Sequence, residues 1–153
     1  MMTGRDEQRS RVYAWEDEMV VPRDPSLIAY GAAQGMVDAI WSELGLRYPP
    51  RVEPLPKQAT TRMADGSRLT LRLPAQTPSW CLLHELAHAL TSTHDGHSDQ
   101  HGPVFAGIYV QLLVRYLRLP QPWLLATLES ADVQVDMRAQ PLFVDTAAFQ
   151  AQL

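Results

Sequence analysis

The chain has 153 residues, of which 46% are hydrophobic and 20% charged, values typical of a folded globular protein. We expect a single domain over residues 1–153. No apolar run approaches the roughly 18 residues of a membrane helix, and the polar first residues do not resemble a secretory signal, so we expect a cytoplasmic protein. The net charge of −4 argues against nonspecific nucleic-acid binding. The only cysteine, Cys81, excludes an internal disulfide and a multi-cysteine zinc ribbon.

The first third of the chain favours two helices. Residues 5–19 carry apolar side chains at roughly helical spacing, and two prolines shortly after them are expected to end that helix. Ser26 is a suitable N-cap for a second helix over residues 27–46, whose apolar residues trace one face. We expect both helices to contribute core packing and no chemistry.

The middle of the chain predicts a β-hairpin, with strands over residues 58–64 and 67–73 and a turn at Asp65-Gly66. The second strand alternates between leucines on one face and polar residues on the other. Such a half-buried strand next to a helix is expected either to cover that helix or to form a sheet edge. An edge would allow an extended peptide to pair with it. The leucines of the expected inner face are Leu69, Leu71 and Leu73.

The most informative segment is an apolar helix that we expect to begin at Thr77-Pro78, with threonine as N-cap and proline at the first position. It contains the pattern H-E-x-x-H. On a helix, His84 and His88 lie on one face and can direct two imidazoles at one metal ion. Glu85, about 100° around the helix, lies beside the position left for water. This arrangement is typical of a zinc hydrolase that activates water.

A polar loop over residues 91–102 offers the third ligand that hydrolytic zinc sites commonly have. All five histidines of the chain lie between residues 84 and 101. His101 is favoured because the following Gly-Pro gives its backbone freedom and then begins the next helix. His94 has the metzincin spacing but lacks the glycine of that pattern, and His97 is the third alternative.

The remaining chain predicts a helix from Pro103, a shorter one near residues 123–131, and an irregularly docked tail after about residue 136. Asp95 or Asp99 is expected to orient a ligand histidine or to cap the loop. Three residues are alternatives for stabilising an oxyanion: His94, His97 and Tyr109.

Two motifs flank the polar loop: His84-Glu85-Leu-Ala-His88 before it and His101-Gly102-Pro103-Val104-Phe105 after it. The chain also opens with Arg5-Asp6-x-Gln8-Arg9-x-x-Val12-Tyr13. The two motifs together resemble the SprT-like zinc metallopeptidases of the wider minigluzincin-like group, over a motif core of about residues 67–118. The chain, including its opening, resembles most a short actinobacterial and phage family of metallohydrolases.

The resemblance implies an α+β fold, with a small antiparallel or mixed sheet packed on a central HExxH helix and further helices flanking it. It implies Zn²⁺ held by His84, His88 and His101, with Glu85 as general base and a peptide or protein as substrate. The cysteine ribbon and basic patch of full-length SprT-type proteins are missing, so DNA–protein crosslink repair is not implied. Two alternatives are a non-catalytic zinc-binding domain and a YbeY-like metal-dependent ribonuclease, which would use His94 as third ligand.

Overall fold

The computed structural model describes residues 6–56 and 64–141 and has an α+β architecture. The α-helices are α1 (Arg9–Trp15), α2 (Tyr30–Glu43), α3 (Ser79–Leu90), α4 (Pro103–Leu117) and α5 (Gln121–Ser130). A π-helical segment η1 (Glu16–Val20) and a 3₁₀ turn η2 (Val21–Arg23) prolong α1. The strands are β1 (Leu27–Ala29), β2 (Arg51–Pro54), β3 (Asp65–Gly66), β4 (Thr70–Leu73) and β5 (Gln76–Pro78). Within the described ranges, no helix combines the length and hydrophobicity needed to cross a membrane.

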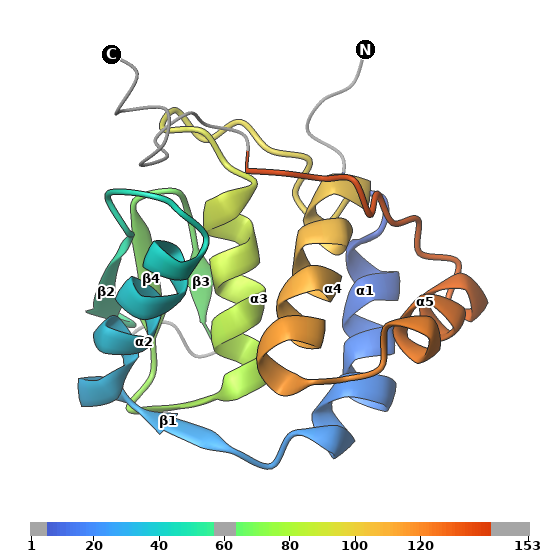
Figure 1. Cartoon of the computed structure of the whole chain (residues 1–153), viewed down its shortest axis with the longest axis horizontal. Helices are drawn as coiled ribbons and strands as arrows, with labels where there is room; N and C mark the ends of the chain where they lie inside the picture. Colours follow the sequence, from blue (N-terminus) through green and yellow to red (C-terminus); the bar gives the residue numbers. More distant parts are fainter. Residues whose placement is uncertain (1–5, 57–63, 142–153) are drawn as a thin grey trace.

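Helix α3 lies at the centre of the molecule, between the small sheet and α4 (Figure 1). All its residues are buried except the first, Ser79, and His88, which is half-buried. Strands β3 and β4 contact one side of α3, while α4 packs on it and separates it from α5. An apolar helix enclosed in this way holds its polar side chains in fixed surroundings.

The three-stranded sheet is mixed and has the order β2-β4-β3, with β4 parallel to β2 and antiparallel to β3. The predicted turn at Asp65-Gly66 is wrong, because these residues form β3. The chain turns instead over residues 67–70, where the Ser67 N–H donates to the Thr70 carbonyl at 2.9 Å. Of the two roles expected for this strand, the sheet edge is not found, because β4 has neighbours on both sides in the described sheet. The other expected strand, over residues 58–64, lies almost entirely outside the described residues.

The alternation expected along residues 67–73 fails at its start. Leu71 and Leu73 are buried, but Leu69 is 52% exposed because it belongs to the turn and precedes the strand. Arg68 is buried in its place: its guanidinium donates to the Tyr48 carbonyl at 3.1 Å and lies 5.0 Å from the centre of the Trp41 ring. The turn therefore reverses which of these neighbouring residues faces inward.

The beginnings of α2 and α3 also differ from prediction. Residues 27–29, expected in a helix, form β1, which pairs antiparallel with β5 directly before α3. Thr77 is buried in β5 and is not the N-cap. The first turn of α3 is capped from elsewhere in the chain, because the Trp80 N–H donates to a carboxylate oxygen of Asp24 at 2.8 Å. The first helix passes the first of the two prolines and reaches Arg23 as a 3₁₀ turn.

An irregular segment after α5 crosses the start of α4. The Asp136 N–H donates to the Pro103 carbonyl at 2.9 Å. At Gly107 of α4, a Cβ would overlap the Asp136 carbonyl oxygen, so glycine is required for this close approach. The predicted start of α4 at Pro103 is confirmed, and α5 begins two residues before its predicted start.

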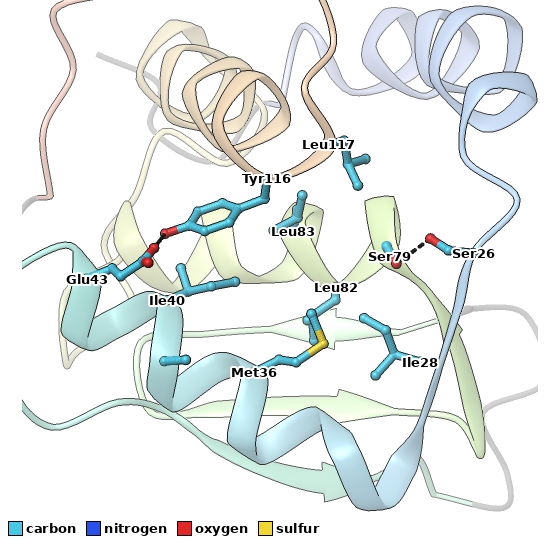
Figure 2. Close-up of a pocket in the computed structure, with 11 residues that line it drawn as sticks. Ser26, Ile28, Met36, Ile40, Glu43, Ser79, Leu82, Leu83, Tyr116 and Leu117 are labelled. Atoms are coloured by element: carbon cyan, nitrogen blue, oxygen red, sulfur yellow. Dashed lines mark hydrogen bonds between the residues drawn. The ribbon is translucent and has the colours of Figure 1, made fainter.

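A mainly apolar pocket of about 410 Å³ lies between α2, α3 and α4 (Figure 2). Leu82 of α3 lines it, on the face of that helix opposite His84. The Tyr116 hydroxyl donates to Glu43 at 2.6 Å within the pocket lining. This pocket is therefore separated from the histidines of α3 by the helix itself.

Candidate metal centre

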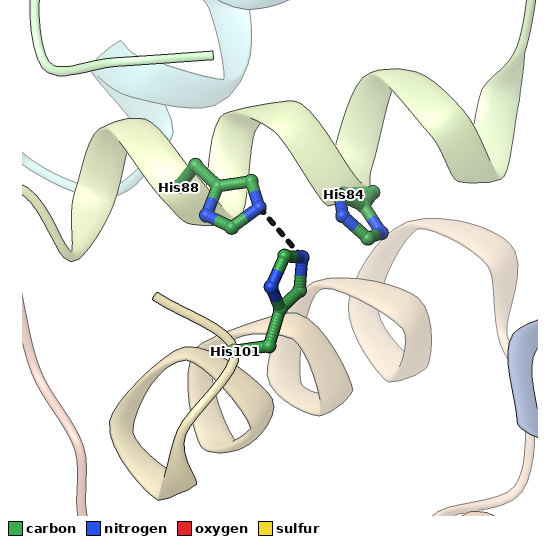
Figure 3. A group of neighbouring side chains, drawn as sticks. All are labelled: His84, His88 and His101. Carbon is green, nitrogen blue, oxygen red and sulfur yellow. Dashed lines mark hydrogen bonds between the residues drawn. The ribbon is translucent and has the colours of Figure 1, made fainter. Parts of the chain in front are cut away.

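Three histidines meet between α3 and the start of α4 (Figure 3). His84 and His88 project from adjacent turns of α3, and His101 approaches them from the residues just before α4. One ring nitrogen from each lies within 4.8 Å of the others. The Nε2 atoms of His88 and His101 are 3.2 Å apart. The structure therefore brings His101 to the two helical histidines.

The spacing of these nitrogens suits one small divalent cation. Two imidazole nitrogens at about 2.0–2.1 Å from a tetrahedral zinc ion are separated by roughly 3.3 Å. The 3.2 Å between His88 Nε2 and His101 Nε2 fits that separation. The three histidines can therefore hold a metal ion with little rearrangement.

The buried carboxylate of Glu16 holds the His84 ring on the side away from the cluster. The His84 Nδ1 lies 2.6 Å from the Glu16 Oε2, which also accepts a hydrogen bond from the Tyr109 hydroxyl at 2.6 Å. Glu16 is 3% exposed and is the first residue of the π-helical segment η1. Such π-helical turns are frequent at functional sites.

His101 has an equivalent partner near the N-terminus. The carboxylate of Asp6 accepts from the His101 backbone N–H at 3.2 Å and lies 2.6 Å from its Nδ1. The amide of Gln8 donates to the His101 carbonyl at 3.0 Å. The orienting carboxylates are therefore Asp6 and Glu16. Asp99 has the alternative role of cap, accepting from two N–H groups in the first turn of α4 at 2.7 and 3.2 Å.

These contacts and burial set the charge of the imidazoles. When a carboxylate accepts from Nδ1, the lone pair of a neutral imidazole is on Nε2, which faces the cluster. Burial lowers the pKa of His88 far below its usual value, and burial lowers that of His101 despite Asp6. Burial is the largest single effect on His84 and acts to lower its pKa, but the charge of Glu16, its hydrogen bond and the charge of Glu85 together outweigh burial, so the pKa is raised.

Glu85 lies beside this cluster on α3 and is 7% exposed. Burial, together with the negative charges of Glu16 and Asp65, raises its pKa to about 7, although His84 acts in the opposite direction. Gly66 of β3 lies against the Glu85 backbone carbonyl, where a Cβ would clash. A carboxyl with a pKa near neutrality can both accept and return a proton.

The other two histidines of the loop lie away from the cluster. His94 and His97 are exposed. The nearby Asp95 is also exposed, and hydrogen bonds from Thr93 and His97 lower its pKa to about 2. The Tyr109 hydroxyl, a third expected oxyanion stabiliser, is fully buried and donates to Glu16.

A tyrosine that the sequence patterns did not single out lies at the exposed side of the cluster. The Tyr13 ring stacks on His84, with 5.7 Å between ring centres and 4° between planes, and lies 5.0 Å from the His101 ring. Partial burial raises its pKa, and the negative charge of Glu85 raises it further. The phenol is therefore protonated at neutral pH.

Asp6, Gln8 and Tyr13 all belong to the opening string that resembles the shorter metallohydrolase family. That resemblance was the only signal that could have found them, because no spacing rule connects them with the histidines.

Three imidazoles, two of them in contact with carboxylates, and a further carboxylate beside them form a site that suits a mononuclear metal ion. No family model, curated protein or solved structure matches the chain.

Proposed function

We propose that this protein is a zinc-dependent hydrolase, a metallopeptidase of the SprT-like and minigluzincin-like type that cleaves peptide bonds. The observation that supports this best is a buried carboxylate, Glu85, next to three clustered imidazoles. A set of neutral nitrogen ligands is typical of zinc, whereas calcium and magnesium prefer oxygen. The proposed ligands are His84, His88 and His101.

In the proposed reaction, Zn²⁺ would lower the pKa of a water molecule and polarise the substrate carbonyl. Glu85 accepts a proton from the water as its oxygen attaches to the carbonyl carbon. The carbon–nitrogen bond then breaks, and Glu85 returns the proton to the leaving amine. In the metal-free protein its pKa is raised to about 7, and a bound Zn²⁺ would lower it and favour the ionised form that accepts the proton.

Two alternatives are less well supported. A YbeY-like ribonuclease would need His94 as third ligand, but His94 is exposed on the loop. A non-catalytic zinc domain would need a fourth protein ligand to close the site. Among the described residues, the metal-binding group consists of His84, His88 and His101, which favours a position left for water.

The test combines metal content with hydrolysis. Zinc-loaded wild type should contain one zinc per chain by elemental analysis and should release labelled fragments from fluorescein-casein. Glu85→Gln should keep the zinc and lose about 10²–10⁴-fold in turnover, whereas Glu7→Gln, at an exposed position, should leave both unchanged. Full turnover by Glu85→Gln would refute the role of Glu85. A closed four-ligand zinc environment by X-ray absorption would refute the hydrolase.

A further inference from the structure

We propose that Tyr13 is a further catalytic residue, whose phenol donates a hydrogen bond to the substrate carbonyl oxygen as negative charge develops there. This inference rests on the proposed function. None of the three residues expected for the role from the sequence is suitable. His94 and His97 are exposed on the loop, and the Tyr109 hydroxyl donates to Glu16.

The position of the Tyr13 ring places it beside the metal-binding nitrogens. It lies against His84 and His101 at once, parallel to the first and tilted by 59° to the second. Tyr13 as a residue is 38% exposed, whereas the other aromatic residues against the histidines, Phe105 and Tyr109, are at most 1% exposed. Tyr13 is therefore the aromatic residue of this group that a substrate can touch.

The surroundings of the hydroxyl indicate which way it can donate. Arg9, one helical turn earlier, is exposed, and its guanidinium lies 5.3 Å from the centre of the Tyr13 ring. Its charge acts to lower the pKa of the phenol, against burial and Glu85. A guanidinium has only donors, so it can approach the phenol oxygen only as a donor and leaves the phenol hydrogen for another acceptor.

Glu85 is close enough to Tyr13 for its charge to act on the phenol. The proton acceptor of the proposed reaction and the Tyr13 phenol therefore both lie near His84. A fixed donor directed at developing oxyanion charge contributes about 10²–10³-fold to kcat. The contact with Arg9 would hold the phenol in place for this role.

Tyr13→Phe tests the proposal because it keeps the ring on His84 and removes only the hydroxyl. The first measurement needs no turnover: the Co²⁺-loaded protein is titrated with acetohydroxamate, whose oxygens represent the reacting carbonyl, and binding is followed in the visible spectrum. The variant should keep the wild-type affinity for Co²⁺ and bind acetohydroxamate about tenfold more weakly, as expected for a lost hydrogen bond to a charged group. With fluorescein-casein, kcat should fall about 10²-fold with KM little changed.

Tyr48→Phe is the matched control, because Tyr48 is an exposed tyrosine in the connection between α2 and β2. Unchanged hydroxamate affinity and turnover in Tyr13→Phe would overturn the proposal. Weaker Co²⁺ binding in that variant would also overturn it, because Tyr13 would then act on the metal and not on the substrate. If wild type cleaves nothing but Tyr13→Phe still weakens hydroxamate binding, the peptidase proposal fails and the position of Tyr13 beside the bound ligand is supported.

Discussion

Two carboxylates determine which ring nitrogen of His84 and of His101 can bind a metal. Glu16 and Asp6 occupy the Nδ1 side of His84 and His101, and both contacts measure 2.6 Å. Nε2 is therefore the nitrogen that faces the cluster on both rings. This role requires the negative charge of the carboxylate as well as its shape, because the charge increases the basicity of the imidazole.

Glu16→Gln should therefore weaken zinc binding about 10–100-fold. The amide keeps nearly the same volume and can still accept a hydrogen bond, but it carries no charge. The zinc dissociation constant can be measured by competition with a chromophoric chelator. Glu18→Gln is the control, since Glu18 is an exposed residue of the same segment η1. Equal affinities in wild type and both variants would show that Glu16 does not tune the site.

The raised pKa of Glu85 predicts a pH effect on the stability of the metal-free protein. The folded pKa of about 7 exceeds the usual value of 4.5, so folding favours the protonated form. Its stability contribution is complete below pH 4.5 and is lost as the pH rises through 7. Glu85→Gln cannot lose its proton, so between pH 5 and pH 8 the metal-free wild type should lose about 1–3 kcal/mol relative to this variant.

Urea unfolding in the presence of a chelator, at pH 5 and pH 8, measures this difference. Glu18→Gln serves again as the exposed control. A stability difference between wild type and Glu85→Gln that is the same at both pH values would contradict a raised pKa for this carboxyl.

Local spacing predicts only part of the site. The spacing of one helical turn predicts His84, Glu85 and His88 as site residues. The Gly-Pro after His101 favours that histidine as third ligand, because glycine frees the backbone and proline begins the next helix. The partner of His84 lies 68 residues away, and that of His101 lies 95 residues away. No pattern within a helix or strand records such pairs, because they depend on how whole elements pack.

At the scale of elements, the errors occur where tertiary contacts override local propensity. Residues 27–29 have no strand alternation strong enough to be read alone, and only Ile28 among them is buried. They form β1 because β5 supplies the backbone partners. The same region brings Asp24 to the start of α3, so the cap of the helix that bears the histidines lies outside that helix.

Asp24→Ala should destabilise the protein by about 1–2 kcal/mol. The substitution removes the carboxylate that accepts from the Trp80 N–H at 2.8 Å and from the Ser26 hydroxyl at 2.5 Å. Urea unfolding of the metal-free protein measures the loss. Asp17→Ala, at an exposed position of η1, should change stability by less than about 0.5 kcal/mol. If the two variants are equally stable, the distant cap has no energetic role.

At the scale of the whole molecule, residues near both ends of the described chain pack beside the candidate metal centre. The Gln8 side chain is 6% exposed and joins the His101 carbonyl to the segment after α5. It donates to the Gln134 carbonyl at 3.2 Å and accepts from the Gln134 N–H at 2.6 Å. Metal binding should therefore be coupled to the packing of segments 126 residues apart.

Gln8→Ala should lower both global stability and zinc affinity, because it leaves the buried His101 carbonyl and the part-buried backbone groups of Gln134 without their partner. A loss of about 1–3 kcal/mol in urea unfolding is expected, with several-fold weaker zinc binding by chelator competition.

Gln111→Ala is the matched control for this substitution. Gln111 also ties α4 to the segment after α5, donating to the Met137 and Ala139 carbonyls at 3.4 and 3.2 Å, but it does not bond to His101. It should reduce stability and leave intrinsic zinc affinity unchanged. Equal effects of the two variants on zinc affinity would mean that Gln8 acts only through general stability and does not hold the third ligand in place.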